Sequence, residues 1–416
     1  MKVLIVNTYD IQGGAARAAY RLHRALIAKS VNSLMLVQFK ASDDFSVLSP
    51  LSTWAKLLGR IRFFFDIFLL KKYKNRKKIL FSSANIPFTD IAERINALEP
   101  DIVHLHWVAG GFFDIKDLIK IKAPIVWTFH DDWPITGGCH IKWDCDMYKT
   151  KCQSCPVLSS DKVNDLSNSL FERKLKYVSM VKHITVVAVS KWLKDCVSES
   201  PIFKGRDVAH LPNLIDLNKF SAFDKAASRK LLNLPLERKL ILFGAMNATG
   251  DINKGFSFLL DALNLIDADD VELVVFGSGP PAIAQNFRQK VHYLGQLNDD
   301  VSLRLVFNAA DVMLVPSIQE SFGQTAVEAM ACGTPVVAFA TSGLLDIIDH
   351  KINGYLADKY NISDFSAGIR WVLYEADRAL LASESVAKVR SHFSEEVVST
   401  KYIDLYEKII KSTNEQ

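Results

Sequence analysis

Residues 315–338 read VPSIQESFGQTAVEAMACGTPVVA and hold a strand end, a loop, a helix and the start of another strand. The apolar run ends at Pro316, a helical pattern begins near Phe322, and Gly333 with Pro335 ends that helix. Continuous apolar strands joined by helices are typical of a parallel sheet that is covered on both faces. This stretch therefore predicts an α/β fold.

The same alternation fills nearly the whole chain of 416 residues in two series, which is too long for one ordinary core. We expect two doubly wound, Rossmann-like domains at 1–210 and 211–393, with a helix at about 394–416 packing back on the first. Ligands bind at the carboxyl ends of such strands, so two facing domains would place a ligand in the cleft between them. The expected strands are KVLIV, NSLMLVQ, DIVHLHW, PIVWTFH and ITVVAVS in the first series, and KLILFGA, VELVVFG, DVMLVP and TPVVAFA in the second.

The composition excludes several classes of protein. Apolar residues make up 49% and charged residues 23%, as in a soluble globular protein. The net charge of +4 comes without an arginine-rich arm or a basic-aromatic repeat, so no nucleic-acid partner is expected. The start MKVLIVNTYD is too short for a signal peptide, and no apolar stretch is long enough to span a membrane. We expect a cytoplasmic protein with reduced thiols.

Two glutamates mark the strand-loop-helix unit as a candidate binding site. Free N–H groups and the positive dipole end at a helix start suit a phosphate oxygen. Glu320 precedes the helix and Glu328 lies about two turns later, so both can face one edge and accept hydrogen bonds from sugar hydroxyls. Two glutamates at this spacing usually lie on a solvated helix face, but the surrounding strand, loop and helix favour a role in ligand binding. Lys254 beside Gly255, after a strand and a loop, favours phosphate binding over a solvated lysine.

Four motifs follow one another in an order that resembles the family-4 retaining glycosyltransferases, over essentially the full chain. They are GGAARAAYRL, TFHD, NKGF and ESFGQTAVEAMACGTPVV. The resemblance implies the GT-B fold, with an acceptor domain followed by a donor domain. It implies transfer of a sugar from a nucleotide-diphosphate sugar to a glycan or lipid-linked oligosaccharide, in polysaccharide or lipopolysaccharide biosynthesis, without a metal or other cofactor for catalysis.

The resemblance also implies roles for individual residues. Glu320 would contact the donor sugar hydroxyls, Glu328 the nucleotide ribose, and His130 the donor sugar. Lys254 would neutralise the leaving diphosphate, where other transferases use a divalent metal. The catalytic set is thus His130, Lys254 and Glu320, and the other donor-binding residues are Gly13, Gly14, Ser321, Phe322, Gly323, Gln324 and Glu328.

One position departs from the family pattern. The family usually has an arginine after the first strand of the second domain, and this chain has Ala245 and Met246 there. Either another cation, for which Arg17 and Arg304 are candidates, assists the lysine, or backbone groups hold the diphosphate.

The sequence predicts the reaction mechanism in outline and leaves alternative functions open. The reacting sugar carbon develops oxocarbenium character. No carboxylate in the motifs is an obvious nucleophile, so a front-face displacement is favoured, although the sequence does not distinguish it from a double displacement. The alternatives are a nucleotide-sugar epimerase, a phosphorylase, and a zinc-dependent interaction protein without catalysis. His104 and His106 are interpreted as histidines of the core or the cleft wall.

The loop HDDWPITGGCHIKWDCDMYKTKCQSCP, residues 130–156, holds four of the six cysteines. The C-x2-C pair suits one edge of a tetrahedral zinc site, but the other spacings are irregular. A structural zinc bound by Cys139, Cys145, Cys152 and Cys155, disulfides, and unlinked thiols all remain open. A site of four cysteines would leave no position for catalysis, so a zinc ion there would brace the loop.

The segment WAKLLGRIRFFFDIFLLKKYKNRKKILF, residues 54–81, is apolar in the middle and basic at both flanks. It is too short to cross a membrane. It is either an amphipathic helix at an anionic surface or a core-packing helix with a solvated basic tail. Contact with the inner face of the cytoplasmic membrane would suit an acceptor carried on a polyprenyl lipid.

Overall fold

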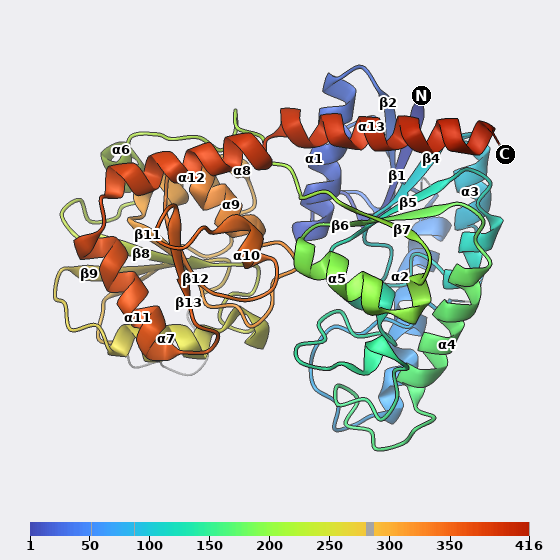
Figure 1. Cartoon of the computed structure of the whole chain (residues 1–416), viewed down its shortest axis with the longest axis horizontal. Coiled ribbons are helices and arrows are strands. Elements are labelled where there is room, and N and C mark those ends of the chain that lie inside the picture. The colour runs from blue at the N-terminus through green and yellow to red at the C-terminus, as the bar shows by residue number, and fades with distance from the viewer. Residues whose placement is uncertain (51, 87, 280–286, 416) are drawn as a thin grey trace. The chain divides into compact units, whose positions relative to one another are not determined.

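The computed structural model describes residues 1–50, 52–86, 88–279 and 287–415. The chain divides into two compact units, one formed by Met1–Pro212 with the segment from Ser399 onward, and the other by Asn213–Val398. Each unit is built on its own parallel sheet with helices packed against it (Figure 1), which confirms the predicted α/β class with two doubly wound domains. Among the described residues, no helix is long and apolar enough to span a bilayer.

The sheet of the first unit has the strand order β3-β2-β1-β4-β5-β6-β7, and every neighbouring pair is parallel. The order reverses between β1 and β4, which makes the carboxyl ends of these strands a switch point where ligands commonly bind. The strands are β1 (Lys2–Tyr9), β2 (Asn32–Phe39), β3 (Val47–Leu48), β4 (Ile102–Leu105), β5 (Ile125–Phe129), β6 (Ile184–Ala188) and β7 (Asp207–His210).

Helix α1 of the first unit buries one apolar stripe, which includes Ala19, Leu22 and Leu26. The C-terminal helix belongs to this unit from Ser399 onward. Its Tyr406 hydroxyl lies 2.6 Å from Nδ1 of His104 on β4. The helical elements are α1 (Gly14–Ala28), α2 (Thr53–Phe68), η1 (Leu69–Lys72), α3 (Ile91–Ala97), η2 (Ile115–Lys120), η3 (Trp133–Ile135), η4 (Met147–Lys149), α4 (Leu166–Ser179), α5 (Lys191–Glu199), η5 (Pro201–Phe203) and α13 (Glu395–Asn414).

The second unit repeats the topology with the strand order β10-β9-β8-β11-β12-β13. Its central strands are buried along their length, which explains their unbroken apolar sequences. The strands are β8 (Lys239–Gly244), β9 (Val271–Phe276), β10 (Val291–Tyr293), β11 (Val312–Val315), β12 (Val336–Phe339) and β13 (Gly354–Ala357). The helical elements are α6 (Lys225–Leu231), η6 (Ile252–Lys254), α7 (Phe256–Asn264), α8 (Asp300–Ala309), α9 (Gln324–Ala331), α10 (Leu344–Ile347), α11 (Ile362–Arg370), η7 (Trp371–Glu375) and α12 (Arg378–His392).

The expected central strands are all present, whereas the edge strands β3, β7, β10 and β13 were not expected. Edge strands are short and partly solvated, so they lack the apolar run that marks a central strand; β7 and β10 are mostly half-buried. In the stretch 315–338, β11 ends at Val315 and α9 begins at Gln324, two residues after the predicted Phe322.

Candidate functional site

An ion pair joins two loops at the carboxyl end of the second sheet. Lys254 ends η6 after β8, and Glu320 lies in the loop between β11 and α9. The Lys254 ammonium is 2.7 Å from Oε1 of Glu320, and the Ser317 hydroxyl donates to the same oxygen at 2.8 Å. Burial by itself lowers the pKa of Lys254, but the Glu320 carboxylate and its hydrogen bond raise the pKa above the usual value. Lys254 is therefore a fixed cation at this edge.

Backbone contacts hold the two loops in register. Ile318 N–H donates to the Asn253 carbonyl at 2.9 Å, and the Asn253 amide donates to the Gln319 carbonyl at 2.8 Å. Gly255 has φ of +70°, and a Cβ there would lie 1.9 Å from the Pro316 carbonyl oxygen. Only glycine permits this approach. The glycine after Lys254 thus lets the lysine loop lie directly against the end of β11.

The Glu320 backbone is fixed by the loop that follows β12. Its N–H donates to the Ser342 hydroxyl at 2.8 Å, and its carbonyl accepts from Gly343 N–H at 2.8 Å. Gly323, with φ of +108°, then caps α9. The first N–H groups of a helix have no partner within the helix, and with the helix dipole they favour an anion. An anion site would therefore lie beside the Lys254 cation.

The side chains around the start of α9 divide into buried and accessible ones. Phe322 is buried and packs edge-on against Phe393, with ring centroids 5.5 Å apart. Glu328 is only 2% exposed, and its charge adds to burial in raising the pKa of Cys332 to about 12. Ser321 and Gln324 are partly exposed. Both amide atoms of Gln324 are buried without a hydrogen-bond partner among the residues placed in the structure.

At the position where the family has an arginine, this chain has Ala245 and Met246, so that position supplies no cation. Met246 is 72% exposed in the loop after β8. Arg304 on α8 donates to the carbonyls of Ser221 at 3.1 Å and Ala222 at 3.3 Å, so its guanidinium is used to hold that segment. A role for Arg17, on α1 of the first unit, stays a prediction.

His130 follows β5 in the first unit and belongs to a row of histidines. Its Nε2 lies 2.9 Å from Nδ1 of His106, and the two rings stack at 5.2 Å. Burial lowers the pKa of His130 to about 4 and that of His104 to about 3, and the pKa of His106 lies well below the usual value. These imidazoles are neutral near pH 7. His104 is fully buried and hydrogen-bonded through both ring nitrogens, as a core histidine would be.

A second polar group beside His130 was not singled out from the sequence. Oδ2 of Asp131 accepts from the Trp107 indole at 2.8 Å and lies 2.6 Å from Nδ1 of His140. Burial raises the pKa of Asp131, but His140 and the donated hydrogen bonds bring it below the usual value. Asp131 is the last residue of the motif TFHD, and Trp107 and Asp131 both follow the ends of neighbouring parallel strands.

The glycine turn at the start of α1 leaves its backbone open. Gly13 caps the helix with φ of +92°, a conformation that favours glycine. Gly14 is exposed, and a Cβ there would meet nothing within 4 Å. The role predicted for this pair stays a prediction.

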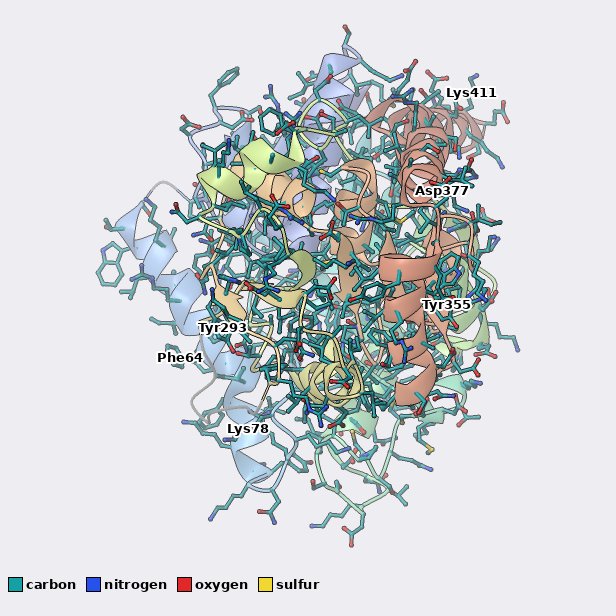
Figure 2. The ribbon with its side chains drawn as sticks, turned by 90° about the vertical axis from the view of Figure 1, so that its left-hand side faces the viewer. Phe64, Lys78, Tyr293, Tyr355, Asp377 and Lys411 are labelled. Atoms are coloured by element: carbon teal, nitrogen blue, oxygen red, sulfur yellow. The ribbon has the colours of Figure 1, made fainter. Side chains whose placement is uncertain are left out.

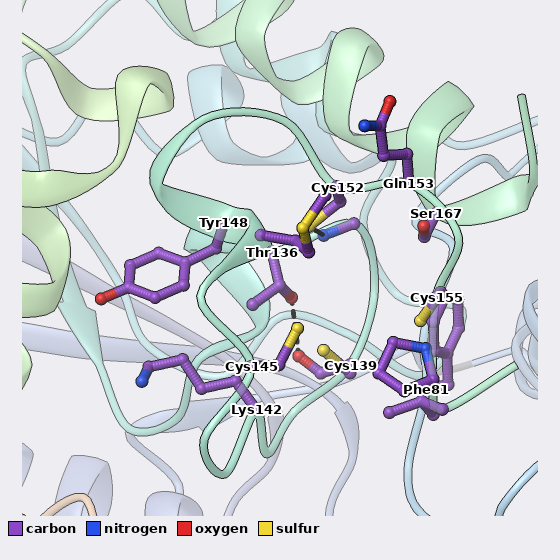
Figure 3. A pocket seen from close by; sticks show the side chains of 14 residues that line it. Phe81, Thr136, Cys139, Lys142, Cys145, Tyr148, Cys152, Gln153, Cys155 and Ser167 are labelled. Atoms are coloured by element: carbon purple, nitrogen blue, oxygen red, sulfur yellow. Dashed lines mark hydrogen bonds between the residues drawn. The ribbon is translucent and has the colours of Figure 1, made fainter. Parts of the chain in front are cut away.

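The four cysteines of the loop line one small cavity of about 20 Å³ (Figure 3). All four are free thiols. Burial raises the pKa of Cys139 well above its usual value and that of Cys152 to about 12. In the described ranges, no three histidine, cysteine or acidic side chains are placed to hold a metal ion. The structural zinc therefore stays a prediction.

Comparisons with known proteins place the chain in a family. The model named Glycosyltransferase Family 4 matches residues 12–219, and the model named Glycosyl transferases group 1 matches residues 237–375. An uncharacterized glycosyltransferase of Methanocaldococcus jannaschii is 28% identical over 332 residues, which are 73% of this chain and 82% of the relative. The N,N'-diacetylbacillosaminyl-diphospho-undecaprenol alpha-1,3-N-acetylgalactosaminyltransferase of Campylobacter jejuni is 27% identical over 206 residues, 48% of this chain and 53% of the relative.

Solved structures show the same fold. Sucrose-phosphate synthase from Thermosynechococcus elongatus has a TM-score of 0.70 at 18% identity, covering 99% of this chain and 100% of its own. Anabaena Alr3699/HepE in complex with UDP-glucose has a TM-score of 0.63 at 16% identity, covering 98% of this chain and 100% of its own. Two GT-B-type sheets and family models over both halves lead to one conclusion: this chain is a glycosyltransferase of family 4.

Proposed function

We propose that the chain is a retaining glycosyltransferase whose second unit binds a nucleotide-diphosphate sugar. The observation that carries the proposal is the Lys254–Glu320 pair, 2.7 Å apart, beside the N-terminus of α9. A fixed cation and free helix N–H groups suit a diphosphate, and a carboxylate suits sugar hydroxyls. The UDP-glucose bound to the Anabaena neighbour supports this class of donor. The family match favours this function over an epimerase or a zinc-dependent interaction protein.

The proposed reaction is a front-face displacement. The acceptor oxygen forms a bond to the sugar carbon while the bond from that carbon to the diphosphate oxygen breaks, and the acceptor hydroxyl proton passes to the departing phosphate oxygen. Lys254 stabilises the negative charge on the leaving group, so this step needs no divalent metal. Glu320 orients the sugar, Glu328 binds the ribose, and Ser321 to Gln324 hold phosphate through the helix start. His130, neutral near pH 7, supplies a hydrogen bond to the sugar.

The acceptor is proposed to be a glycan or a polyprenyl-linked oligosaccharide in polysaccharide assembly. The diphospho-undecaprenol in the name of the Campylobacter relative supports a lipid-linked acceptor. Any metal held by the cysteine loop would be structural, because four thiolates fill a tetrahedral site.

The test is incubation of the purified chain with a panel of nucleotide sugars, with and without a chelator. Release of nucleoside diphosphate from at least one donor, unchanged by the chelator, is the expected result. The anomeric configuration of the product, read by nuclear magnetic resonance, decides between retention and inversion. A panel in which no donor is bound or consumed would overturn the proposal.

A further inference from the structure

Helix α2 (Thr53–Phe68) turns a polar stripe toward the protein and an apolar stripe away from it. Its buried residues are Gly59, Arg62 and Asp66, which recur at spacings of three and four and so share one face. A surface helix of a globular protein normally does the reverse. The core-packing interpretation of segment 54–81 is therefore wrong for this helix.

Specific contacts fix the polar stripe against the first unit. Oδ1 of Asp66 accepts from the N–H groups of Ser83 at 2.7 Å and Ala84 at 2.8 Å. Arg62 donates to the Phe88 carbonyl and to Asp90. These bonds would break if α2 rolled to bury its apolar stripe, so the outward orientation of that stripe is built into the fold.

Close backbone packing supports the same orientation. A Cβ at Gly59 would lie 1.8 Å from the Gln38 side-chain nitrogen, and one at Gly111 would lie 2.5 Å from the backbone nitrogen of Phe63. The helix backbone thus sits directly on its neighbours along the buried stripe. The apolar side chains point the other way, as Phe64 does in Figure 2.

The outward stripe is large and aromatic. Trp54 is 74% exposed, Phe64 67% and Phe68 56%. An apolar surface of this kind on a soluble protein marks an interaction site. The spacings of three and four residues place the stripe on one side of the helix; its other members are Leu57, Leu58, Ile61 and Phe65.

Within segment 54–81 the exposed charged side chains are all basic. Asp66 is the sole acidic residue of segment 54–81, and it is buried in the bonds described above. Seven basic residues of the segment are exposed: Lys56, Arg60, Lys71, Lys72, Lys74, Lys77 and Lys78. Two copies of such a surface would repel each other, whereas anionic headgroups above an apolar layer would match both its charge and its apolar stripe.

We propose that the outward stripe of α2, with the basic segment 71–78, docks the protein on an anionic lipid bilayer. The helix would lie along the interface, because its 16 residues are too few to cross the bilayer. The aromatic rings would enter the headgroup region, and the lysines would reach lipid phosphates. This surface goes beyond the transfer reaction and does not depend on the donor or the acceptor.

The test is co-sedimentation of the full chain with vesicles of phosphatidylcholine, with or without phosphatidylglycerol. We expect pelleting with the anionic vesicles at low salt, and weaker pelleting at high salt or with neutral vesicles. The triple variant Trp54→Ser/Phe64→Ser/Phe68→Ser should bind at least about tenfold more weakly, because it removes the apolar part of the interaction.

A matched control removes three exposed apolar residues from the second unit. Leu231→Ser/Leu265→Ser/Leu380→Ser, at residues 64%, 53% and 56% exposed, should bind vesicles like the wild type. The α2 variant should keep the wild-type thermal midpoint, since its polar stripe is untouched. Failure to pellet with anionic vesicles, equal binding by the α2 variant, or self-association through α2 in place of vesicle binding would each overturn the proposal. Donor turnover in solution is measured separately, so its loss would not be mistaken for loss of docking.

Discussion

The substitution Lys254→Met tests the role proposed for the Lys254–Glu320 pair. At 2.7 Å, with an effective dielectric constant of ~20, Coulomb's law gives about 6 kcal/mol of gross attraction. Both side chains retain some exposure, 23% and 17%, and both lose hydration, so we expect a net loss of unfolding free energy of roughly 1–3 kcal/mol. The loss in turnover should be larger, on the order of 10²–10³-fold, because the cation acts on charge that develops as the diphosphate leaves.

The assay combines nucleoside diphosphate release with calorimetric titration of the nucleoside diphosphate alone. Lys254→Met should lower both turnover and affinity for the diphosphate. Glu320→Gln keeps the cation and removes the carboxylate that occupies it, so turnover should fall while nucleoside diphosphate binding is kept or tightened. The double variant should lose less stability than the sum of the single ones, because the two charges interact directly.

The control is Lys388→Met, which removes a lysine of similar exposure, 18%, paired with Asp349 at 2.9 Å in the same unit. It should leave turnover within about twofold of the wild type, because this pair is not part of the proposed donor site. If Lys254→Met keeps wild-type turnover, or if Lys388→Met loses as much, the assignment of Lys254 to the leaving group is refuted.

Three further predictions concern the backbone, the histidines and the cysteines. Gly295→Ala should lower the unfolding free energy of the second unit by roughly 1–2 kcal/mol through left-handed strain alone, because a Cβ there meets nothing within 4 Å. Gly255→Ala should cost more, because its Cβ would also meet a backbone oxygen. Equal losses in urea unfolding would contradict this. Burial lowers the pKa of His104 to about 3 and that of His23 to about 4, so the unfolded chain binds more protons than the folded chain below about pH 6.5. The free energy of unfolding should therefore fall toward pH 4 by about 1.4 kcal/mol per pH unit for each histidine. An unfolding free energy that stays constant between pH 7 and 5 in urea would contradict this. If the cysteine loop is a closed zinc site, protein purified without chelator should carry about one zinc ion per chain, and Cys139→Ser should remove that ion. Near-zero zinc, with all four thiols of the loop free, would mean that these cysteines are unlinked.

Central elements were predictable from the sequence because burial on both faces makes a strand continuously apolar. Strand β9 is buried at every residue and was expected at full length. Strand β7, at the edge of its sheet, is mostly half-buried and has no such pattern. It ends at His210, where the sequence predicted the boundary between the two domains. The sequence signal for a strand is therefore a signal of burial, and it fades toward the edges of a sheet.

The candidate site was predictable where a residue type carries the chemistry. Lys254 and Glu320 were expected from their motifs, and the structure brings their charged groups together across 66 residues of sequence. Ser342 and Gly343 were not expected, because they act through one hydroxyl and one backbone N–H that hold Glu320. Such groups leave no pattern in a single sequence, since almost any loop could supply them.

The pairing of His106 with His130 shows what the sequence could have revealed. Both lie at the ends of two expected strands that follow one another along the chain, and in the structure β4 and β5 pair with Leu105 opposite Trp127. Residues that follow two adjacent strands meet at the same edge, so a contact between these rings was within reach of topology alone. Their chemistry was not, because the low pKa of His130 comes from burial, which depends on side chains contributed by the whole unit.

The orientation of α2 depends on contacts of Asp66 that the periodicity of the sequence does not show. The pattern of segment 54–81 left two orientations open, with the apolar stripe either at an anionic surface or packed inward as in most surface helices. The structure turns the polar stripe inward, where Oδ1 of Asp66 accepts hydrogen bonds from three donors of Ser83 and Ala84. A buried carboxylate needs such partners. An acid placed opposite the aromatic residues, followed by a polar segment that can donate to it, is the feature that separates a helix with an outward apolar stripe from a core helix here. Asp66→Leu should thus cost stability without improving the burial of Phe64, since the helix would lose its anchor and keep its exposed stripe.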